Sequence, residues 1–446
     1  MNGSSSGAPG RKTFWTLLRF YAPLALQTIS QCLAYPLVGS VVAHGRLGPQ
    51  EFADFAQGQT MMFFIGAIGG GLITTGMVFA RSKTGMRNYL RMNRAVTLAA
   101  GLLQLLCCIP PFDRWVFGGL MGLAGDHLSI ARNTMLLCLP MNLSFFLRNP
   151  YLATLLSEKR SVIATTATMI RIALTLALSF VFVQVNLVGW HWGALVSSLP
   201  VFLETYLCRV FAKPSMDALT DDGDAEKAPV LRQLRFSIPL AFGAVLLCGN
   251  GIIVATFLGQ TADPDFSRAI HYVVWGIVSP LGAAALRLQT VTISFPPSQY
   301  GFGRVQTFAL AVGVFFGLVS LAGQIPAFSN WYFGTVQNLS PDMLPFARRA
   351  VLILFVFSIF QALRGHAEGL AALRRRPNTI LAANASYVAT MTIALMFLIH
   401  SPVNGCYIGI ISSIAATMAA VVTLRIALLG NDLADQYGVT HAHPTD

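Results

Sequence analysis

The chain has 446 residues, of which 54% are hydrophobic and only 11% are charged. Soluble domains carry roughly 25% charged residues, so this composition excludes an ordinary soluble protein. The net charge of +12 comes from 25 arginines and 5 lysines against 18 acidic residues. A basic excess can indicate nucleic-acid binding. In so apolar a chain it is typical of the cytoplasmic loops of a membrane protein, so we expect no nucleic-acid partner.

Apolar runs that reach the roughly 20 residues needed to cross a bilayer recur along the whole chain. Twelve spans are predicted, near 14–43, 50–80, 89–111, 129–156, 162–184, 192–212, 231–258, 267–294, 305–325, 345–373, 378–400 and 405–429. The N-terminal sequence MNGSSSGAPGRK lacks the apolar core and cleavage site of a signal peptide, so the first span is expected to stay in the protein.

One long polar segment, 213–229, interrupts these spans, and its Asp, Pro and Gly content is typical of a linker. The predicted organisation is an N-terminal tail 1–13, a six-helix bundle 14–212, the linker 213–229, a second six-helix bundle 230–430 and a C-terminal tail 431–446. With both termini inside, 20 of the 30 basic residues fall on the inner side and six in the outer loops. The tails and the linker are therefore predicted to face the cytoplasm.

Two short sequence matches recur at the same offset of 216 residues. They pair Arg19-Phe20-x-x-Pro23-Leu24-Ala25 with Arg235-Phe236-x-x-Pro239-Leu240-Ala241, and Leu147-Arg148 with Leu363-Arg364. Six helices return a chain to the side of the membrane where it began. The halves are therefore predicted to be parallel repeats related by an axis along the membrane normal, with the substrate site between them.

Four arginines fall deep inside predicted spans: Arg148, Arg171, Arg287 and Arg364. Each lies roughly ten residues from the cytoplasmic end of its span. That is about 15 Å at 1.5 Å per residue, near the midplane of a 30 Å core. Ionisable groups at this depth are costly and indicate a functional site. Arginine suits phosphate and carboxylate because its planar fork donates two parallel hydrogen bonds, so we expect a positive cavity that binds an anion, with Arg171 a weaker member than the other three.

A structural role for the same arginines is the alternative interpretation. Glu368 lies one helical turn after Arg364, where it can either neutralise that arginine or join it in the binding site. The other acids inside spans, Asp54 and Glu204, are expected near span ends. That placement leaves an excess of positive charge at the midplane, which favours the anion site.

Four further residues are candidates for binding or gating. His366 lies in the same span as Arg364, where a histidine either packs or carries a proton. Gly70 belongs to a glycine-rich stretch that permits close helix approach or a bend. Pro23 and Pro239 lie early in equivalent spans, where kinks can serve gating or can be inherited with the repeat.

No cofactor, metal ion or catalytic centre is expected. The seven cysteines lie within or at the edges of apolar segments without the spacing of a zinc site, so we interpret them as packing residues. The chain has no GxxxxGK[ST] motif, which excludes an ATP-driven pump of that type within it. The outer loops are short and poor in histidine and acids, which argues against a membrane enzyme.

The chain also resembles the progressive ankylosis (Ank) family, a branch of the multidrug/oligosaccharidyl-lipid/polysaccharide (MOP) exporter superfamily. The similar pieces are Gly76-Met77-Val78-Phe79-x-x-Ser82-Lys83, Pro239-Leu240-Ala241 and Arg364-x-His366-x-x-Gly369. The resemblance covers nearly the whole chain. It implies a MATE-like fold of two six-helix bundles, alternating access at a central cavity, and export of small polyanions such as pyrophosphate, a nucleotide or citrate. In one stretch the chain departs from this pattern. Thr290 and Thr292 stand where the family carries charged residues before a proline like Pro296, and the nearby arginine is Arg287.

Two other transporter classes share the expected fold. Cation-coupled drug exporters usually need a buried carboxylate in an early span, whereas the first span here offers Gln27 and Gln31. Flippases for pyrophosphate-linked lipid oligosaccharides also use cationic cavities and are the second candidate. The expected partners are a small anionic substrate and the membrane lipids. The protein is expected to be a monomer, and the coupling ion, if any, stays open.

Overall fold

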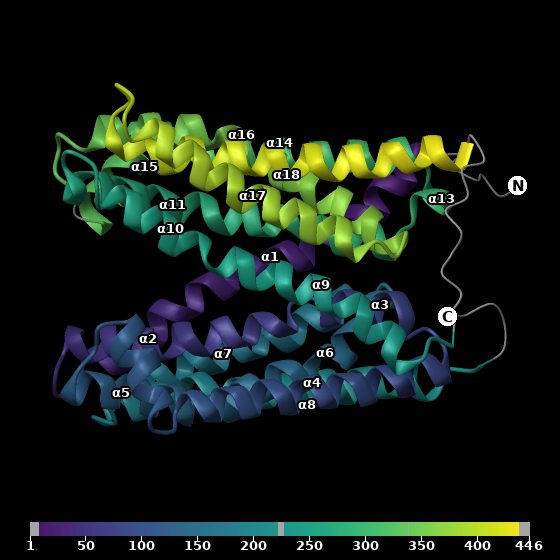
Figure 1. Ribbon diagram of the computed structural model, residues 1–446, viewed down its shortest axis with the longest axis horizontal. Helices are drawn as coiled ribbons and strands as arrows, with labels where there is room; N and C mark the ends of the chain where they lie inside the picture. Colours follow the sequence, from purple (N-terminus) through teal and green to yellow (C-terminus); the bar gives the residue numbers. More distant parts are fainter. Residues whose placement is uncertain (1–8, 222–226, 338, 437–446) are drawn as a thin grey trace, which may run out of the picture. The chain divides into compact units, whose positions relative to one another are not determined.

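The structure is a computed structural model that describes residues 9–221, 227–337 and 339–436, and within them the regular structure is entirely helical (Figure 1). The first half contains α1 (Pro9–Ala43), α2 (Pro49–Gly66), η1 (Ala67–Gly69), α3 (Leu72–Phe79), α4 (Lys83–Cys107), η2 (Arg114–Leu120), α5 (Gly125–Leu137), α6 (Leu139–Ser157), α7 (Ser161–Gln184) and α8 (Trp190–Asp217). The second half contains α9 (Val230–Cys248), α10 (Asn250–Leu258), α11 (Pro264–Leu286), α12 (Leu288–Ser294), α13 (Pro297–Tyr300), α14 (Phe302–Ser320), η3 (Leu321–Gln324), α15 (Pro326–Ser329), η4 (Asn330–Val336), α16 (Leu344–Leu373), α17 (Pro377–Leu398) and α18 (Gly405–Gln436).

Helices occupy all twelve predicted spans, so the prediction of an all-α polytopic membrane protein is confirmed. Within the described residues, ten helical stretches are long and apolar enough to cross a membrane on length and composition alone. α1 and α4 are not among those ten. The first half of α4 carries Arg87, Arg91 and Arg94, which lower its mean hydropathy.

The 216-residue repeat extends to the helix boundaries themselves. α7 begins at Ser161 and α17 at Pro377, and α3 begins at Leu72 and α12 at Leu288. The π-helical segments η2 (Arg114–Leu120) and η4 (Asn330–Val336) begin and end at positions 216 residues apart. The two halves therefore repeat these helix boundaries, although the break between α9 and α10 has no counterpart in α1 and the break between α5 and α6 has none in α16.

Contacts divide the described residues into two compact units, one within 18–248 and the other formed by 9–17 with 249–436. α9 packs in the first unit, where the Phe79 and Phe236 rings meet edge to face with centroids 5.1 Å apart. The start of α1 packs in the second unit, where Phe14 meets Phe308 at 5.2 Å. The compact units therefore differ from the two predicted bundles, because α9 packs with the first half and the start of α1 packs with the second.

The break between α2 and α3 shows how α9 is seated in the first unit. A Cβ atom at Gly70 would lie 2.8 Å from the Cβ of Ala244, and one at Gly71 would collide with Leu240. Thr75 and Ser237 also share a hydrogen bond of 2.8 Å. The glycines therefore provide both properties expected of them, a helix break and a close helix approach.

Candidate functional site

One cluster of charged side chains lies where α6, α7 and α8 meet, inside the unit 18–248. Glu204 Oε2 is 2.5 Å from Arg148 Nη1 and 3.4 Å from Arg171 Nη1. Its other oxygen, Oε1, accepts a hydrogen bond of 2.5 Å from Thr168 Oγ1. The Glu204 side chain is completely buried, whereas the two arginine side chains are 11% and 10% exposed. Two cations thus share one carboxylate, and the cluster carries a net charge of +1.

The position of Glu204 corrects the prediction from sequence, which put this acid near a span end. α8 runs without a break from Trp190 to Asp217, through Pro200 and Pro214, so Glu204 falls in its middle. A lone carboxylate there would be costly to bury, and it is retained because two guanidinium groups and a hydroxyl surround it. Glu204 and Thr168 are thus members of the site that sequence reasoning missed.

The turn of α6 that carries Arg148 is stabilised by a hydrogen bond from α4, which the proline inside α6 makes necessary. Pro150, inside the helix, has no N–H to donate to the carbonyl of Phe146. Asn93 of α4 supplies the missing donor, with its Nδ2 3.0 Å from the Phe146 carbonyl oxygen. This bond ties α4 to the turn of α6 that carries Arg148, so the arginine sits on a fixed piece of backbone.

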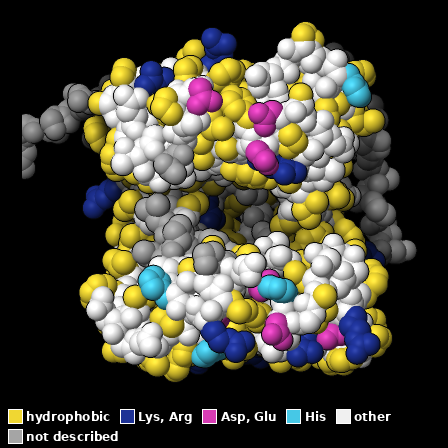
Figure 2. All heavy atoms as spheres, turned by 90° about the vertical axis from the view of Figure 1, so that its left-hand side faces the viewer, with side chains coloured by type: hydrophobic (Ala, Val, Ile, Leu, Met, Phe, Trp, Pro, Cys, Tyr) yellow, Lys and Arg dark blue, Asp and Glu magenta, His cyan; other side chains and the backbone are white. Residues whose placement is uncertain are grey.

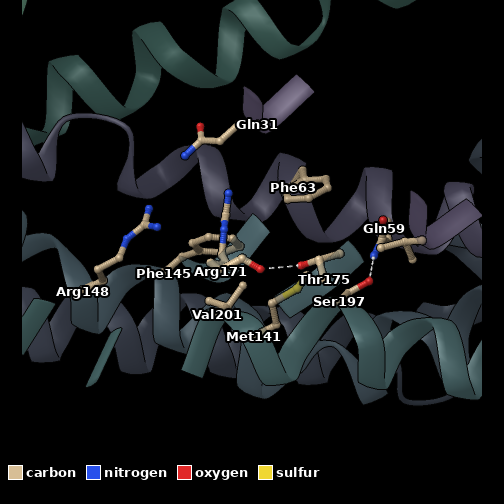
Figure 3. A pocket seen from close by; sticks show the side chains of 11 residues that line it. Gln31, Gln59, Phe63, Met141, Phe145, Arg148, Arg171, Thr175, Ser197 and Val201 are labelled. Atoms are coloured by element: carbon tan, nitrogen blue, oxygen red, sulfur yellow. Dashed lines mark hydrogen bonds between the residues drawn. The ribbon is translucent and has the colours of Figure 1, made fainter. Parts of the chain in front are cut away.

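Both arginines line a cavity of about 240 Å³ within this unit (Figure 3). Figure 3 shows the Arg171 guanidinium directed toward Gln31, with Arg148 on the same side of the cavity. The Phe145 ring lies below both cations, 4.9 Å from the Arg148 guanidinium carbon and 6.0 Å from that of Arg171. The rest of the lining is mixed apolar and neutral polar: Val38, Gln59, Phe63, Met141, Thr175, Ser197 and Val201. Among the described residues, no hydrogen-bond partner is found for Arg148 Nε.

The second group of predicted residues lies in the other unit, 9–17 with 249–436. Arg364 is 2% exposed, and its Nε donates to Glu368 Oε1 at 2.8 Å. Its Nη2 donates to Asn384 Oδ1 at 2.6 Å, and its guanidinium lies 5.1 Å from the centre of the Tyr387 ring. The ion pair expected from the four-residue spacing therefore forms, and α17 closes around it.

The remaining predicted residues take these places in the fold. His366, fully buried in α16, shares a hydrogen bond of 2.9 Å between its Nδ1 and Thr292 Oγ1 of α12. Arg287 joins α11 to α12 and is partly buried. Pro23 lies inside α1, and Pro239 lies inside α9. The structure thus brings Arg148 together with Arg171, and separately Arg364 with Glu368.

Several solved structures are similar to this chain over almost its whole length. A MOP superfamily transporter from Pyrococcus furiosus, whose binding pocket is described as having a reverse polarity that suggests a different function, is 14% identical with a TM-score of 0.75, covering 95% of this chain and 96% of its own. A multidrug resistance MATE family transporter in an outward-facing conformation is 16% identical with a TM-score of 0.75, covering 94% and 97%.

The eukaryotic MATE transporter AtDTX14 is 15% identical with a TM-score of 0.69, covering 94% of this chain and 96% of its own. The chain has the MATE-like fold. At these identities the likeness shows the fold alone. No protein-family model matches the sequence, and a search of curated proteins finds no match.

Proposed function

We propose that the chain is a secondary transporter that binds a small anion at Arg148 and Arg171. The observation that carries this proposal is the sharing of one buried carboxylate, Glu204, by two arginines that line a cavity. One positive charge is left over at that cavity. Arginine remains protonated at any physiological pH and pairs well with carboxylate and phosphate. A net cation within a membrane protein is tolerated where it faces a wet cavity and binds an anion.

The substrate class proposed is a small polyanion such as pyrophosphate, a nucleotide or a citrate-like acid, exported by alternating access. The resemblance to the Ank family supports this class. The Pyrococcus furiosus transporter with a pocket of reverse polarity supports the idea that pocket charge differs among transporters of this fold. The helix break at Gly70 and the prolines Pro23 and Pro239 are the proposed hinges. The predicted residues Arg287 and His366 remain proposed contributors from the second half, whereas the closed pair of Arg364 and Glu368 is proposed to stabilise that half.

The proposed orientation puts both termini and the linker 213–229 in the cytoplasm. The lower half of Figure 2 shows the end of the unit 18–248 at which α2 and α5 begin, and there acidic side chains are interspersed with basic ones. The sequence concentrates its basic residues in the loops predicted at the opposite end. In a cysteine-free protein in sealed cells, an external thiol reagent should label a cysteine at position 262 or 402 and leave one at 220 unlabelled. Labelling at 220 would reverse the orientation.

The test of the function is flux in proteoliposomes against a panel of anions that includes pyrophosphate, ATP and citrate. The parent should move at least one of them, and Arg148→Ala should abolish most of that flux. Arg209→Ala is the matched control because Arg209 is an exposed arginine on α8 of the same unit. Equal flux in the parent and Arg148→Ala would overturn the proposal. Movement of a pyrophosphate-linked lipid oligosaccharide, without movement of any free anion, would favour a flippase.

A further inference from the structure

We propose that Glu204 is a proton site linked to the anion site: its carboxylate takes up a proton from solution when an anion occupies Arg148 and Arg171, so that anion and proton are bound together. The inference rests on the proposed function of the cavity and adds to it a coupling ion. It would make the transported species an anion with its proton.

The geometry makes Glu204 and an incoming anion competitors for the same donors. Arg148 and Arg171 both form ion pairs with one oxygen of Glu204, and both line the cavity from which an anion would approach. A planar guanidinium has five N–H donors, and those that face Glu204 stabilise the negative charge of its carboxylate. An anion that engages either arginine from the cavity weakens that hold.

Charge balance then decides the fate of the carboxylate. Without substrate the three side chains sum to +1, which keeps the buried Glu204 ionised. A monoanion brings the sum to zero, and a dianion brings it to −1 beside a carboxylate that is completely buried. An uncompensated negative charge in such surroundings is costly, and a proton on Glu204 removes it. The more highly charged the anion, the more strongly it requires the proton.

A protonated Glu204 also finds a ready hydrogen-bond acceptor. Thr168 Oγ1 now donates to Glu204 Oε1 and accepts from Gln27 Nε2 of α1 at 2.7 Å. A hydroxyl oxygen has two lone pairs, so Thr168 can accept from a Glu204 O–H while it still accepts from Gln27. The proton can therefore be held in a hydrogen bond to Thr168, whose own O–H then turns away from Glu204.

The other titratable groups around Glu204 are accounted for on each neighbouring helix. Arg148 on α6 and Arg171 on α7 face it directly, and Cys208 lies one turn further along α8 itself. On the remaining neighbours, α2 and α5, Asp126 is exposed in the first turn of α5, and the other titratable groups have partners of their own. Asp54 of α2 pairs with His127 of α5 at 2.7 Å, Arg132 of α5 pairs with Asp113 at 3.2 Å, and Glu51 of α2 accepts the backbone N–H of Trp190 at 2.7 Å.

The experiment measures proton uptake when potassium pyrophosphate is added to the purified protein in weakly buffered detergent solution. The parent and Glu204→Gln are compared at equal occupancy, so that protons carried by pyrophosphate itself cancel. We expect the parent to take up about one more proton per bound anion than the variant. The ratio of the parent and variant dissociation constants should then change by up to about tenfold per pH unit, the linkage for one proton.

Glu158→Gln is the control, since Glu158 is a carboxylate of the same unit that bonds to Ser215 and does not line the cavity. It should behave as the parent. If Glu204→Gln fails to fold, infrared difference spectra of the parent decide the question. Addition of pyrophosphate should produce the carbonyl band of a protonated carboxylic acid.

The two proposals fail in different ways. If pyrophosphate binds through Arg148 and Arg171 but the parent and Glu204→Gln take up equal numbers of protons, with no acid band, the proton site is wrong and the anion site stands. If neither pyrophosphate nor any other anion of the panel binds to the parent, the proposed function itself fails, and the proton site with it.

Discussion

The two arginine clusters occupy equivalent places in the sequence repeat and have been given different partners. Arg148 corresponds to Arg364 at the 216-residue offset, Thr168 to Asn384, and Arg171 to Tyr387. In the first cluster two arginines share Glu204 beside a cavity. In the second, one arginine is paired with Glu368, hydrogen-bonded to Asn384 and covered by Tyr387.

The different partners point to different functions for the two clusters, ligand binding in the first and stabilisation of the fold in the second. Replacing the second arginine by tyrosine changes the local charge from +1 to zero and covers the remaining guanidinium with a ring. The acid moves as well, because the counterpart of Glu204 is Ala420, and the counterpart of Glu368 is Leu152. A cation left over at a cavity suits a ligand, whereas a balanced and closed pair ties α16 to α17.

The largest expected effect tests the closed cluster. Arg364→Ala leaves Glu368 buried without its partner, which should cost about 3–5 kcal/mol of stability. Anion affinity per folded molecule should change much less than the stability does. Thermal unfolding and binding of labelled pyrophosphate, measured on the same preparation, separate the two effects. A loss of binding equal to that of Arg171→Ala would instead place Arg364 in the binding site, as the sequence analysis predicts.

Next in size is the effect of Arg171→Ala on the open cluster. Loss of a charged hydrogen bond to the anion should weaken binding by about 1.5–3 kcal/mol, more than tenfold. Arg171→Lys keeps the charge but loses the planar fork, so its affinity should lie between those of the parent and the alanine variant. Equilibrium binding checks the order. Affinity unchanged in both variants would remove Arg171 from the site.

A smaller effect is expected for the hydrogen bond from Asn93 that compensates for Pro150 in α6, which the second half does not repeat. The counterparts of Pro150 and Asn93 are His366 and Ala309, so the second half lacks both the proline and the amide that compensates for it. Asn93→Ala leaves the buried Phe146 carbonyl unpaired and should cost about 1–3 kcal/mol of stability. Anion affinity should fall slightly because Arg148 loses its support. If thermal unfolding shows no destabilisation, the carbonyl does not depend on Asn93.

The smallest effect concerns the segment after α8. Asp221 accepts hydrogen bonds from the Thr84 backbone N–H at 2.8 Å and from Thr84 Oγ1 at 2.7 Å. These bonds lower the pKa of Asp221, with Lys227 and Arg87 adding to the effect. Because the docked carboxylate has the lower pKa, the anchor is present at neutral pH and is lost as the pH falls through that lowered value.

The rate of amide hydrogen exchange at the start of α4, taken relative to the intrinsic rate at each pH, should therefore rise on acidification. Asp221→Asn should remove most of this added pH dependence. An identical pH profile in the parent and the variant would show that Asp221 does not anchor the segment.

The sequence was sufficient for the fold class, for helices over the twelve predicted spans and for the repeat, since each depends on local composition or on a fixed spacing. It predicted the local pair of Arg364 and Glu368 but not the partners of Arg148 and Arg171. Glu204 was expected at a span end, although its position at the centre of the predicted span 192–212 was a usable signal. Which arginines pair with Glu204 depends on which faces of α6, α7 and α8 meet. The spacing of apolar residues along each helix does not predict those contacts. The Asp221 anchor was missed for the same reason, because it joins residues 137 positions apart.

The central claim is that the charge surplus at Arg148 and Arg171 drives anion transport. It is tested most directly by removing the whole cluster without leaving an unpaired charge. The triple variant Arg148→Met, Arg171→Met and Glu204→Gln replaces a buried ionic triad by neutral side chains, a change that proteins often tolerate without loss of stability. We predict a folded protein, with thermal stability close to that of the parent, that moves no pyrophosphate, ATP or citrate in proteoliposomes. Anion flux at the parent rate in this folded variant would contradict the account.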